Sequence, residues 1–454
     1  MGDFIGSVWW MIVSLGVLVT FHEFGHFWVA RRCGVKVLRF SVGFGKPLWS
    51  YHDRHGTEFA IAAIPLGGYV KMLDEREGEV APAERDQAFN TKSVWQRIAI
   101  VAAGPIANLV LCVALLWAMF VIGKQDYAAV VGRAEGLALQ AGLQPGERIV
   151  RIGEREVSSW SDASMQLTVA AMDAADVRIQ TEDTRDGASR VHTLRLSQLP
   201  AGFDEQQVPR LAGLTWRFSL QPAIVSKVTP GSAADGVLRP GDLILAVDGA
   251  SVAGADQVAP QVQALARNGG SGLVEVERNG ERLALEVRLT PSKDPQLKGL
   301  SLGVKVGQQD GPPPPFDAKL QYGPLAAIPV AFRETGKLAG DTLGLIRRML
   351  TGQASIKNVS GPITIAKVAN VSAQQGPDWF LYFLALLSLS LAIMNLLPIP
   401  ILDGGHLLYY LIELVKGSPL SERAMAAGQF VGLTMLAGLM GLAFYNDIFG
   451  QVLR

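Results

Sequence analysis

The feature that most constrains this chain is a set of long runs without charged residues. A helical span needs about 20 mostly apolar residues to cross the hydrocarbon core of a bilayer. Four runs meet that length, and we place the spans at residues 1–30, 98–122, 380–405 and 424–446. The sequence therefore predicts a polytopic α-helical membrane protein with four transmembrane helices.

Two further segments could be mistaken for different structures. Residues 322–350 are apolar but carry six charged side chains, so we expect one or two amphipathic helices on a protein or membrane surface. The first run lacks the basic start of a signal peptide, and no small-residue cleavage site precedes Arg31. We expect it to stay attached as a helix.

Basic residues in the short loops predict the orientation. Residues 31–97 contain 11 Lys and Arg, and the loop between the last two spans adds Lys416 and Arg423. Cytoplasmic loops carry such an excess. Both short loops should therefore be cytoplasmic, with the termini and residues 123–379 outside.

Composition excludes two classes of protein. The chain has 41 basic and 41 acidic residues, so it lacks the basic surface that nucleic acid requires. Its two cysteines are too few for a disulfide scaffold. Cys33 falls in a predicted cytoplasmic loop and Cys112 within a span, so we expect no disulfide between them.

The segment between spans two and three contains an internal repeat. Residues 142–152 align with residues 237–247, and both copies contain Pro-Gly, an acidic residue and then alternating apolar residues. This pattern is typical of a turn that enters a half-buried strand. A second match, Ala-Gly-Leu at 212–214 and Leu-Gly-Val at 302–304, closes the copies.

The repeat resembles circularly permuted bacterial PDZ domains. We place two mainly-β PDZ-like domains at 123–218 and 219–309, followed by a Pro-rich linker and amphipathic helices at 310–379. In that family a loop of the type apolar-Gly-apolar accepts an added peptide strand. The alternative is that each copy is only a folding unit without a ligand.

A metal-binding motif lies near the inner end of the first span. His22 and His26 are one helical turn apart, so their imidazoles share a helix face and can hold one Zn²⁺, while Glu23 can act as a general base. Ionisable residues within a span are costly and usually functional. The alternative is a pair of unrelated histidines near a helix end.

A catalytic zinc needs a third protein ligand, and Asp403 is the candidate. It follows a Pro-rich break at the end of span three, in the sequence Asn-Leu-Leu-Pro-Ile-Pro-Ile-Leu-Asp that begins at Asn395. The orientation predicted from the basic loops makes spans one and three both run from outside to inside. Asp403 and the two histidines lie near the inner ends of these spans, so we expect them at a similar depth in the membrane. Two imidazoles and a carboxylate could also hold iron.

These residues closely resemble the site-2 protease family of intramembrane zinc metalloproteases. The matching motifs are His-Glu-x-x-His at 22–26 and Asn-x-x-Pro-x-Pro-x-Leu-Asp-Gly at 395–404. Four spans around tandem PDZ-like domains look like the bacterial RseP-type group. Gly-Pro-Ile-Ala-Asn at 104–108 and the segment 67–72 also match that group, and the resemblance covers nearly the whole chain.

The resemblance implies roles for individual residues. A single zinc ion would be held by His22, His26 and Asp403, with Glu23 as the catalytic base. Asn395 would contact the substrate backbone, and a membrane-associated β-hairpin region in 31–97 would hold substrate along an edge strand through Gly67, Gly68 and Tyr69. Asn108 would help shape the site, although a close helix contact at Gly104 could also explain that motif. His406 is a nearby residue without an assigned role.

The predicted reaction is peptide-bond hydrolysis within a transmembrane helix of a single-pass protein, the cleavage step of regulated intramembrane proteolysis. The resemblance implies anti-sigma factors or remnant signal peptides as substrates, a size-filter role for the PDZ-like domains, and a location in the bacterial inner membrane. The PDZ-like domains would be periplasmic and the active site near the cytoplasmic side. One rival hypothesis is a membrane-anchored PDZ adaptor or chaperone with a structural zinc site. A second is a zinc transporter, but spans two and four lack the charged residues that would line an ion pathway.

Overall fold

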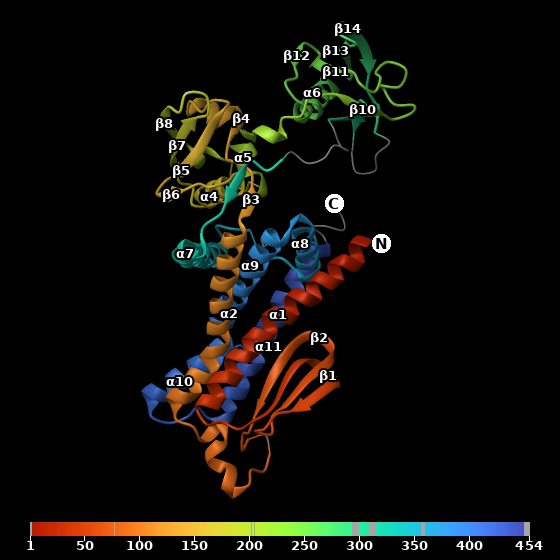
Figure 1. Ribbon diagram of the computed structural model, residues 1–454. Helices are drawn as coiled ribbons and strands as arrows, with labels where there is room; N and C mark the ends of the chain where they lie inside the picture. The colour runs from red at the N-terminus through yellow and green to blue at the C-terminus, as the bar shows by residue number, and fades with distance from the viewer. Residues whose placement is uncertain are drawn as a thin grey trace. The chain divides into compact units, whose positions relative to one another are not determined.

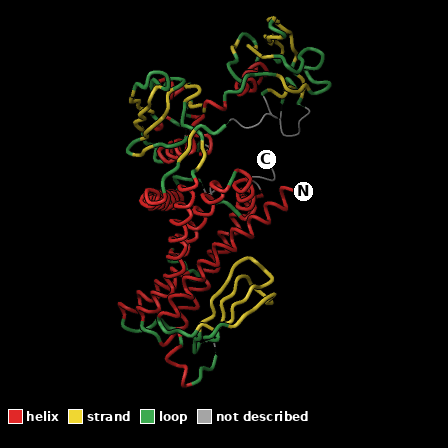
Figure 2. Tube along the Cα trace, in the orientation of Figure 1, coloured by secondary structure: helices red, strands yellow, loops and turns green. Residues whose placement is uncertain are grey.

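The computed structural model of the 454-residue chain divides into two compact units. One unit contains Met1–Lys124 and Leu320–Arg454, and the other contains Gln125–Lys319. The structure describes residues 2–76, 78–200, 202–203, 205–292, 299–307, 315–355 and 359–448. Figure 1 labels the elements of both units, and Figure 2 shows that the first is mainly helical while strands and loops dominate the second.

Four helices of the described chain are long and apolar enough to cross a membrane. They are α1 (Gly2–Arg32), α2 (Val94–Ile122), α9 (Pro377–Leu396) and α11 (Glu422–Asp447). The second unit is inserted between α2 and α9 and is mainly β. The predicted fold class, a polytopic helical membrane protein with inserted mainly-β domains, is confirmed.

Two span boundaries differ from the prediction for local reasons. Helix α2 begins four residues before the predicted start, because Ser93 and Gln96 form a capping box that satisfies the first backbone donors. Helix α9 ends at Leu396. Pro398 and Pro400 lack the backbone N–H that a continuing helix needs, so residues 397–402 leave the helix earlier than predicted.

The loop after α1 forms a curved sheet from two long, bent strands, β1 (Val37–His52) and β2 (Glu58–Met72). The first half of β1 pairs on one side with residues 58–61 and on the other with residues 68–72, so residues 68–72 form an edge of this sheet. Large apolar side chains are exposed along the hairpin: Phe44, Leu48, Trp49, Tyr51, Ile61 and Ile64. This pattern fits the predicted membrane-associated hairpin.

The remaining helices of this unit pack around the spans. Residues 322–350 form one helix, α7 (Pro324–Leu350), which buries Ala327, Ala331 and Leu338 in an apolar cluster with α2 and α9. Helix α8 (Pro362–Gln375) packs on α1 and α9. Two short 3₁₀ turns and one amphipathic helix complete the unit: η1 (Pro82–Gln87), η2 (Phe89–Thr91) and α10 (Asp403–Lys416).

The second unit contains two copies of one strand arrangement. In the first copy the sheet order is β6-β5-β7-β8, and in the second it is β12-β11-β13-β14, so corresponding strands occupy corresponding places. Each copy also has a strand pair outside its four-stranded sheet, β4 with β9 and β10 with β17. The sequence repeat is therefore a repeat of structure. The PDZ-like assignment and its boundaries stay a prediction.

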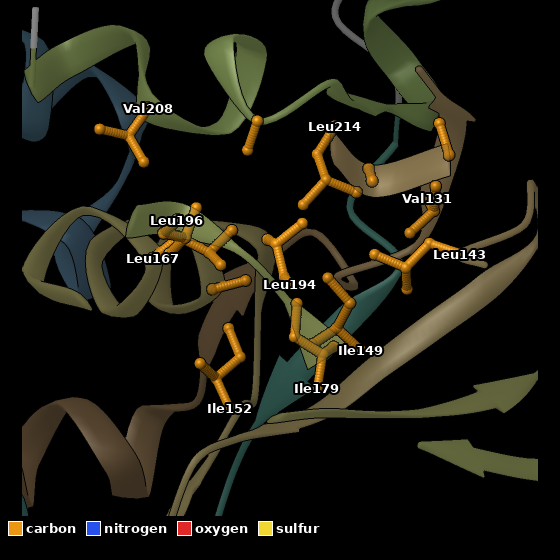
Figure 3. Packing of buried hydrophobic residues seen from close by; sticks show 14 of the residues in the cluster. Val131, Leu143, Ile149, Ile152, Leu167, Ile179, Leu194, Leu196, Val208 and Leu214 are labelled. Carbon is orange, nitrogen blue, oxygen red and sulfur yellow. The ribbon is translucent and has the colours of Figure 1, made fainter. Parts of the chain in front are cut away.

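The elements of the first copy surround one apolar core, in which the sheet packs against helix α4 (Figure 3). The elements are β4 (Val131–Ala134), α3 (Gly136–Gln140), β5 (Glu147–Ile152), β6 (Arg155–Glu156), α4 (Trp160–Met172), β7 (Val177–Asp183), β8 (Ser189–Leu194), η3 (Leu196–Gln198), η4 (Glu205–Gln207), α5 (Val208–Leu211), β9 (Leu214–Trp216) and η5 (Arg217–Ser219).

The second copy has its own core, in which α6 covers the sheet. Its elements are β10 (Val225–Val228), β11 (Leu243–Val247), β12 (Ala250–Ser251), α6 (Ala255–Arg267), β13 (Ser271–Arg278), β14 (Glu281–Arg288), β15 (Thr290–Pro291), β16 (Leu300–Ser301) and β17 (Val304–Val306). Short strands flank the insert at β3 (Lys124–Asp126) and β18 (Ala318–Leu320). Most of the predicted Pro-rich linker at 311–316 lies outside the described residues.

Candidate active site

The histidine motif lies in the last third of α1, on the face that packs against α2. Gly25, between the two histidines, makes this close packing possible, because a Cβ there would lie 2.3 Å from the carbonyl oxygen of Ala103. His22 and His26 are consequently buried against α2, while Glu23 is half-buried. The helical spacing that the sequence predicts therefore becomes a buried pair of imidazoles.

Asp403 meets this pair from the other end of the chain. Its Oδ2 lies 3.2 Å from His22 Nε2 and 3.5 Å from His26 Nε2, and the two Nε2 atoms are 3.2 Å apart. His22, His26 and Asp403 are the three described residues whose ligand atoms converge in this way. The structure thus brings together residues separated by most of the sequence.

These distances fit a zinc ion. Zinc bonds of about 2.0–2.2 Å at tetrahedral angles place neighbouring ligand atoms about 3.3–3.6 Å apart. The three separations observed here are close to that range. Asp403 Oδ2 is also buried and has no hydrogen-bond partner among the described residues, which is costly for a carboxylate unless a cation neutralises it. Two imidazoles and one carboxylate leave a fourth position open, as a catalytic site needs.

The broken backbone after α9 sets the position of Asp403. Residues 397–402 are non-helical, Ile401 adopts a φ of 101°, and Asp403 is the first residue of α10. The two glycines that follow allow the chain to double back: a Cβ on Gly404 would lie 2.1 Å from the carbonyl of Leu397, and one on Gly405 would lie 2.5 Å from that of Ile399. The Gly-Gly pair is therefore a steric requirement of this turn.

Helix α2 contacts the imidazoles of both histidines. His26 Nδ1 lies 2.8 Å from the carbonyl oxygen of Ile100, which can only accept a hydrogen bond. Nδ1 therefore carries the proton in the neutral ring, and Nε2 keeps its lone pair for a metal. Gly104 leaves room for both rings, because a Cβ there would lie 2.3 Å from His26 Nε2 and 2.8 Å from His22 Cε1.

The edge of the β1–β2 sheet adjoins Glu23. A Cβ on Gly68 would lie 3.2 Å from Glu23 Cγ, and the backbone N–H of Val70 on the same edge faces the Glu23 carboxylate. Gly68 is also close to β1, where its Cβ would lie 2.7 Å from the Ser41 carbonyl. Glycine at this position lets the edge strand approach the motif helix directly.

The other predicted residues lie around this centre. Tyr69 belongs to the same sheet edge as Gly68, and its ring stacks on Phe44 with ring centroids 6.2 Å apart. Gly67, with a φ of 143°, directly precedes that edge. Asn395 is half-buried in the last turn of α9, and its amide makes no hydrogen bond within the described chain. His406 lies outside the converging group. The roles of these residues stay predictions.

Asn108 is fully buried and reaches the metal-site histidines from α2. Its Nδ2 lies 3.2 Å from His22 Nδ1, and Ser388 on α9 donates to its backbone carbonyl at 2.7 Å. The sequence indicated a place for Asn108 at the site and left its contact open. The structure supplies that contact.

The sequence did not indicate the contacts at the site that are made by backbone atoms or allowed by glycines. The carbonyl of Ile100 and the N–H of Val70 carry no side-chain signal, and the contact of Gly104 with both rings was read only as possible helix packing. Gly432 on α11 was also missed, although a Cβ there would lie 1.7 Å from the carbonyl of Pro400, next to the Asp403 turn. Its spacing of four from Gly428 is the available signal for such a close approach.

Comparison with known proteins agrees with this geometry. The model of peptidase family M50 matches residues 10–439. A putative zinc metalloprotease of Xylella fastidiosa strain 9a5c is 63% identical over 450 residues, which cover 99% of this chain and 100% of the relative. The regulator of sigma-E protease RseP of Escherichia coli K12 is 41% identical over 442 residues, covering 96% and 97%. The predicted recognition is confirmed: the chain belongs to peptidase family M50, the site-2 proteases, and is a zinc metalloprotease.

Proposed function

We propose that His22, His26 and Asp403 hold the zinc ion of this intramembrane metalloprotease and that Glu23 is its catalytic base. The observation that carries the proposal is the convergence of three ligand atoms, 3.2–3.5 Å apart, beside a helix-borne glutamate. These separations match a tetrahedral zinc site with an open position. The reaction is hydrolysis of a peptide bond within a membrane.

The chain's own residues supply the proton transfers. When bound, zinc supplies a Lewis acid that makes water a competent nucleophile near neutral pH. Glu23 is adjacent to His22 in the sequence, and its side chain lies against Gly68 and Val70 of the sheet edge. From there Glu23 takes a proton from the attacking water and passes it to the leaving amine. Gln in its place could hold the same position but could not accept the proton.

The substrate we propose is a transmembrane helix that unwinds at the site. Each backbone group freed from a helix in lipid costs several kcal/mol unless it finds a partner. Residues 68–72 form a sheet edge next to Glu23 and can pair with the freed backbone as an added strand. We assign Gly67, Gly68 and Tyr69 to this edge. The unpaired amide of Asn395 is available for the same substrate backbone.

The natural substrates we propose are single-pass membrane proteins, such as anti-sigma factors or remnant signal peptides. The similarity to a relative named regulator of sigma-E protease supports the first class. We place the enzyme in a bacterial inner membrane with the second unit periplasmic and the metal site near the cytoplasmic side, since the short loops are basic. The two β domains would then exclude substrates with bulky ectodomains.

A cleavage assay tests the proposal. Purified protein in detergent is incubated with a transmembrane substrate peptide, as wild type, as Glu23→Gln, and after treatment with a chelator. We expect cleavage by the wild type alone, with Glu23→Gln still binding zinc. Cleavage by Glu23→Gln at the wild-type rate would refute the assignment of the base, and a zinc-binding wild type that cleaves no transmembrane substrate would favour an adaptor.

A further inference from the structure

Asn108 presents an unusual pairing of polar atoms. Its side chain is 0% exposed, and its Nδ2 lies 3.2 Å from His22 Nδ1. Its Oδ1 is buried and has no hydrogen-bond partner among the described residues. His22 Nδ1 is therefore the described hydrogen-bond partner of this amide.

Metal binding decides which ring nitrogen of His22 carries the proton. His22 presents Nε2 to the converging group, so that atom must be unprotonated when it binds a metal. The proton of the neutral ring then resides on Nδ1, which becomes a hydrogen-bond donor. In the orientation described above, this N–H would face the N–H of Asn108, and two donors would oppose each other.

A half-turn of the Asn108 amide removes this opposition of two donors. The oxygen and nitrogen of an amide have nearly the same size and exchange places when the group rotates. After that rotation Oδ1 lies where Nδ2 was, near 3.2 Å from His22 Nδ1. Oδ1 then accepts a hydrogen bond from His22 Nδ1–H.

The Nδ1 atom of His26 also faces a hydrogen-bond acceptor, which in this case is a backbone carbonyl. Its Nδ1 lies 2.8 Å from the backbone carbonyl of Ile100. With the amide of Asn108 turned in this way, helix α2 faces the outer nitrogen of each histidine with a carbonyl oxygen, one from its backbone and one from a side chain. Ser388 on α9 donates a hydrogen bond of 2.7 Å to the Asn108 backbone carbonyl, and this bond does not involve the side-chain amide.

We propose that Asn108 is a positioning residue, which accepts a hydrogen bond from His22 Nδ1–H and so fixes the ring and the proton arrangement that zinc requires. This inference rests on the ligand role proposed above for His22. Partners of this kind orient metal-binding histidines and raise their basicity, and their loss commonly weakens metal binding about 10–100-fold.

The test is a zinc affinity measured on the full chain in detergent, by competition with a chromophoric chelator. Asn108→Ala removes the acceptor, whereas Asn108→Asp keeps one at the same place. We expect about 10–100-fold weaker binding for Asn108→Ala and wild-type affinity within about threefold for Asn108→Asp. Ser388→Ala, which removes a buried bond to the Asn108 backbone but leaves the side-chain acceptor, is the control and should bind zinc as the wild type does.

A second readout separates positioning from folding. Cobalt(II) in place of zinc reports ligand geometry by its visible absorption, so Asn108→Ala should change that spectrum while Asn108→Asp keeps it. Zinc binding by Asn108→Ala within twofold of wild type, or an equal loss in both Asn108 variants, would overturn the inference. His22→Ala should abolish the high-affinity site; if it binds zinc as tightly as wild type, the ligand assignment itself fails.

Discussion

The replacement of Gly104 by Ala tests how tightly α2 constrains the metal site. The added Cβ would lie 2.3 Å from His26 Nε2, whereas packed non-bonded atoms rest about 3.5 Å apart, so the overlap is about 1.2 Å. A second close contact, 2.8 Å to His22 Cε1, prevents relief by movement of one ring alone. Both imidazoles must therefore shift by about 1 Å, or α1 must separate from α2.

The expected result is a large loss of function without loss of the fold. A misplacement of about 1 Å can lower a catalytic rate about 10²-fold. We expect kcat/KM for a transmembrane substrate to fall by about that factor in Gly104→Ala, and the zinc bound per chain after dialysis to fall with it. Gly16→Ala, on α1 with open space around its Cβ, is the matched control and should behave as wild type. Wild-type zinc content and activity in Gly104→Ala would refute the packing argument.

Two further predictions concern the Asp403 turn and the second β domain. Gly432→Val should lower zinc retention, because its Cβ would lie 1.7 Å from the Pro400 carbonyl, whereas Gly438→Val, in open space, should not; equal retention would contradict this. Arg278 donates two hydrogen bonds of 2.7 Å to buried Asp242 and holds the pKa of that carboxyl below its usual value of 3.8. The stabilisation of the folded domain by this ion pair is therefore present above about pH 4 and is lost as the pH falls through the pKa of Asp242 in the folded state. Asp242→Asn should destabilise this domain by about 1.5–3 kcal/mol near neutral pH and remove that acid dependence. Hydrogen exchange of β13 and β14 in the full chain, corrected for intrinsic rates, measures both effects, and unchanged protection in Asp242→Asn would contradict the second.

The membrane spans and the metal motif could be predicted because each depends on the type and spacing of side chains, which the sequence shows directly. Uncharged runs indicated the four long helices, and the spacing of His22 and His26 placed both rings on one helix face. Asp403 was found because an acidic residue after two prolines and before two glycines is unusual at a membrane boundary. Its meeting with the histidines followed from the predicted orientation of the spans, which brings their inner ends to one depth.

The supports of the site could not be predicted because they depend on tertiary contacts. The Ile100 carbonyl and the Val70 N–H exist in every sequence, so nothing marks them as partners of His26 and Glu23. Helix α10 was not predicted, because span three was expected to end at residue 405, whereas Gly404 and Gly405 lie in the first turn of a helix that continues to Lys416. Their small size is required by close backbone contacts that no sequence pattern reveals.

The same reasoning explains the edge next to Glu23. The segment 67–72 was predicted to hold substrate, but the pairing of β1 with two parts of β2 depends on how the long strands bend. That bend leaves residues 68–72 at the edge and brings Gly68 against α1. Strand register and curvature of this kind are set by packing against the helix.

Zinc content per chain decides whether His22, His26 and Asp403 together form the metal site. The wild type, Asp403→Ala and Glu23→Gln are purified in parallel, dialysed against a weak chelator and analysed by mass spectrometry of the metal. We expect a single zinc ion in the wild type and in Glu23→Gln, and a large loss in Asp403→Ala, since two imidazoles alone hold the ion weakly. A full complement of zinc in Asp403→Ala would show that the carboxylate is not a ligand and would contradict the site described here.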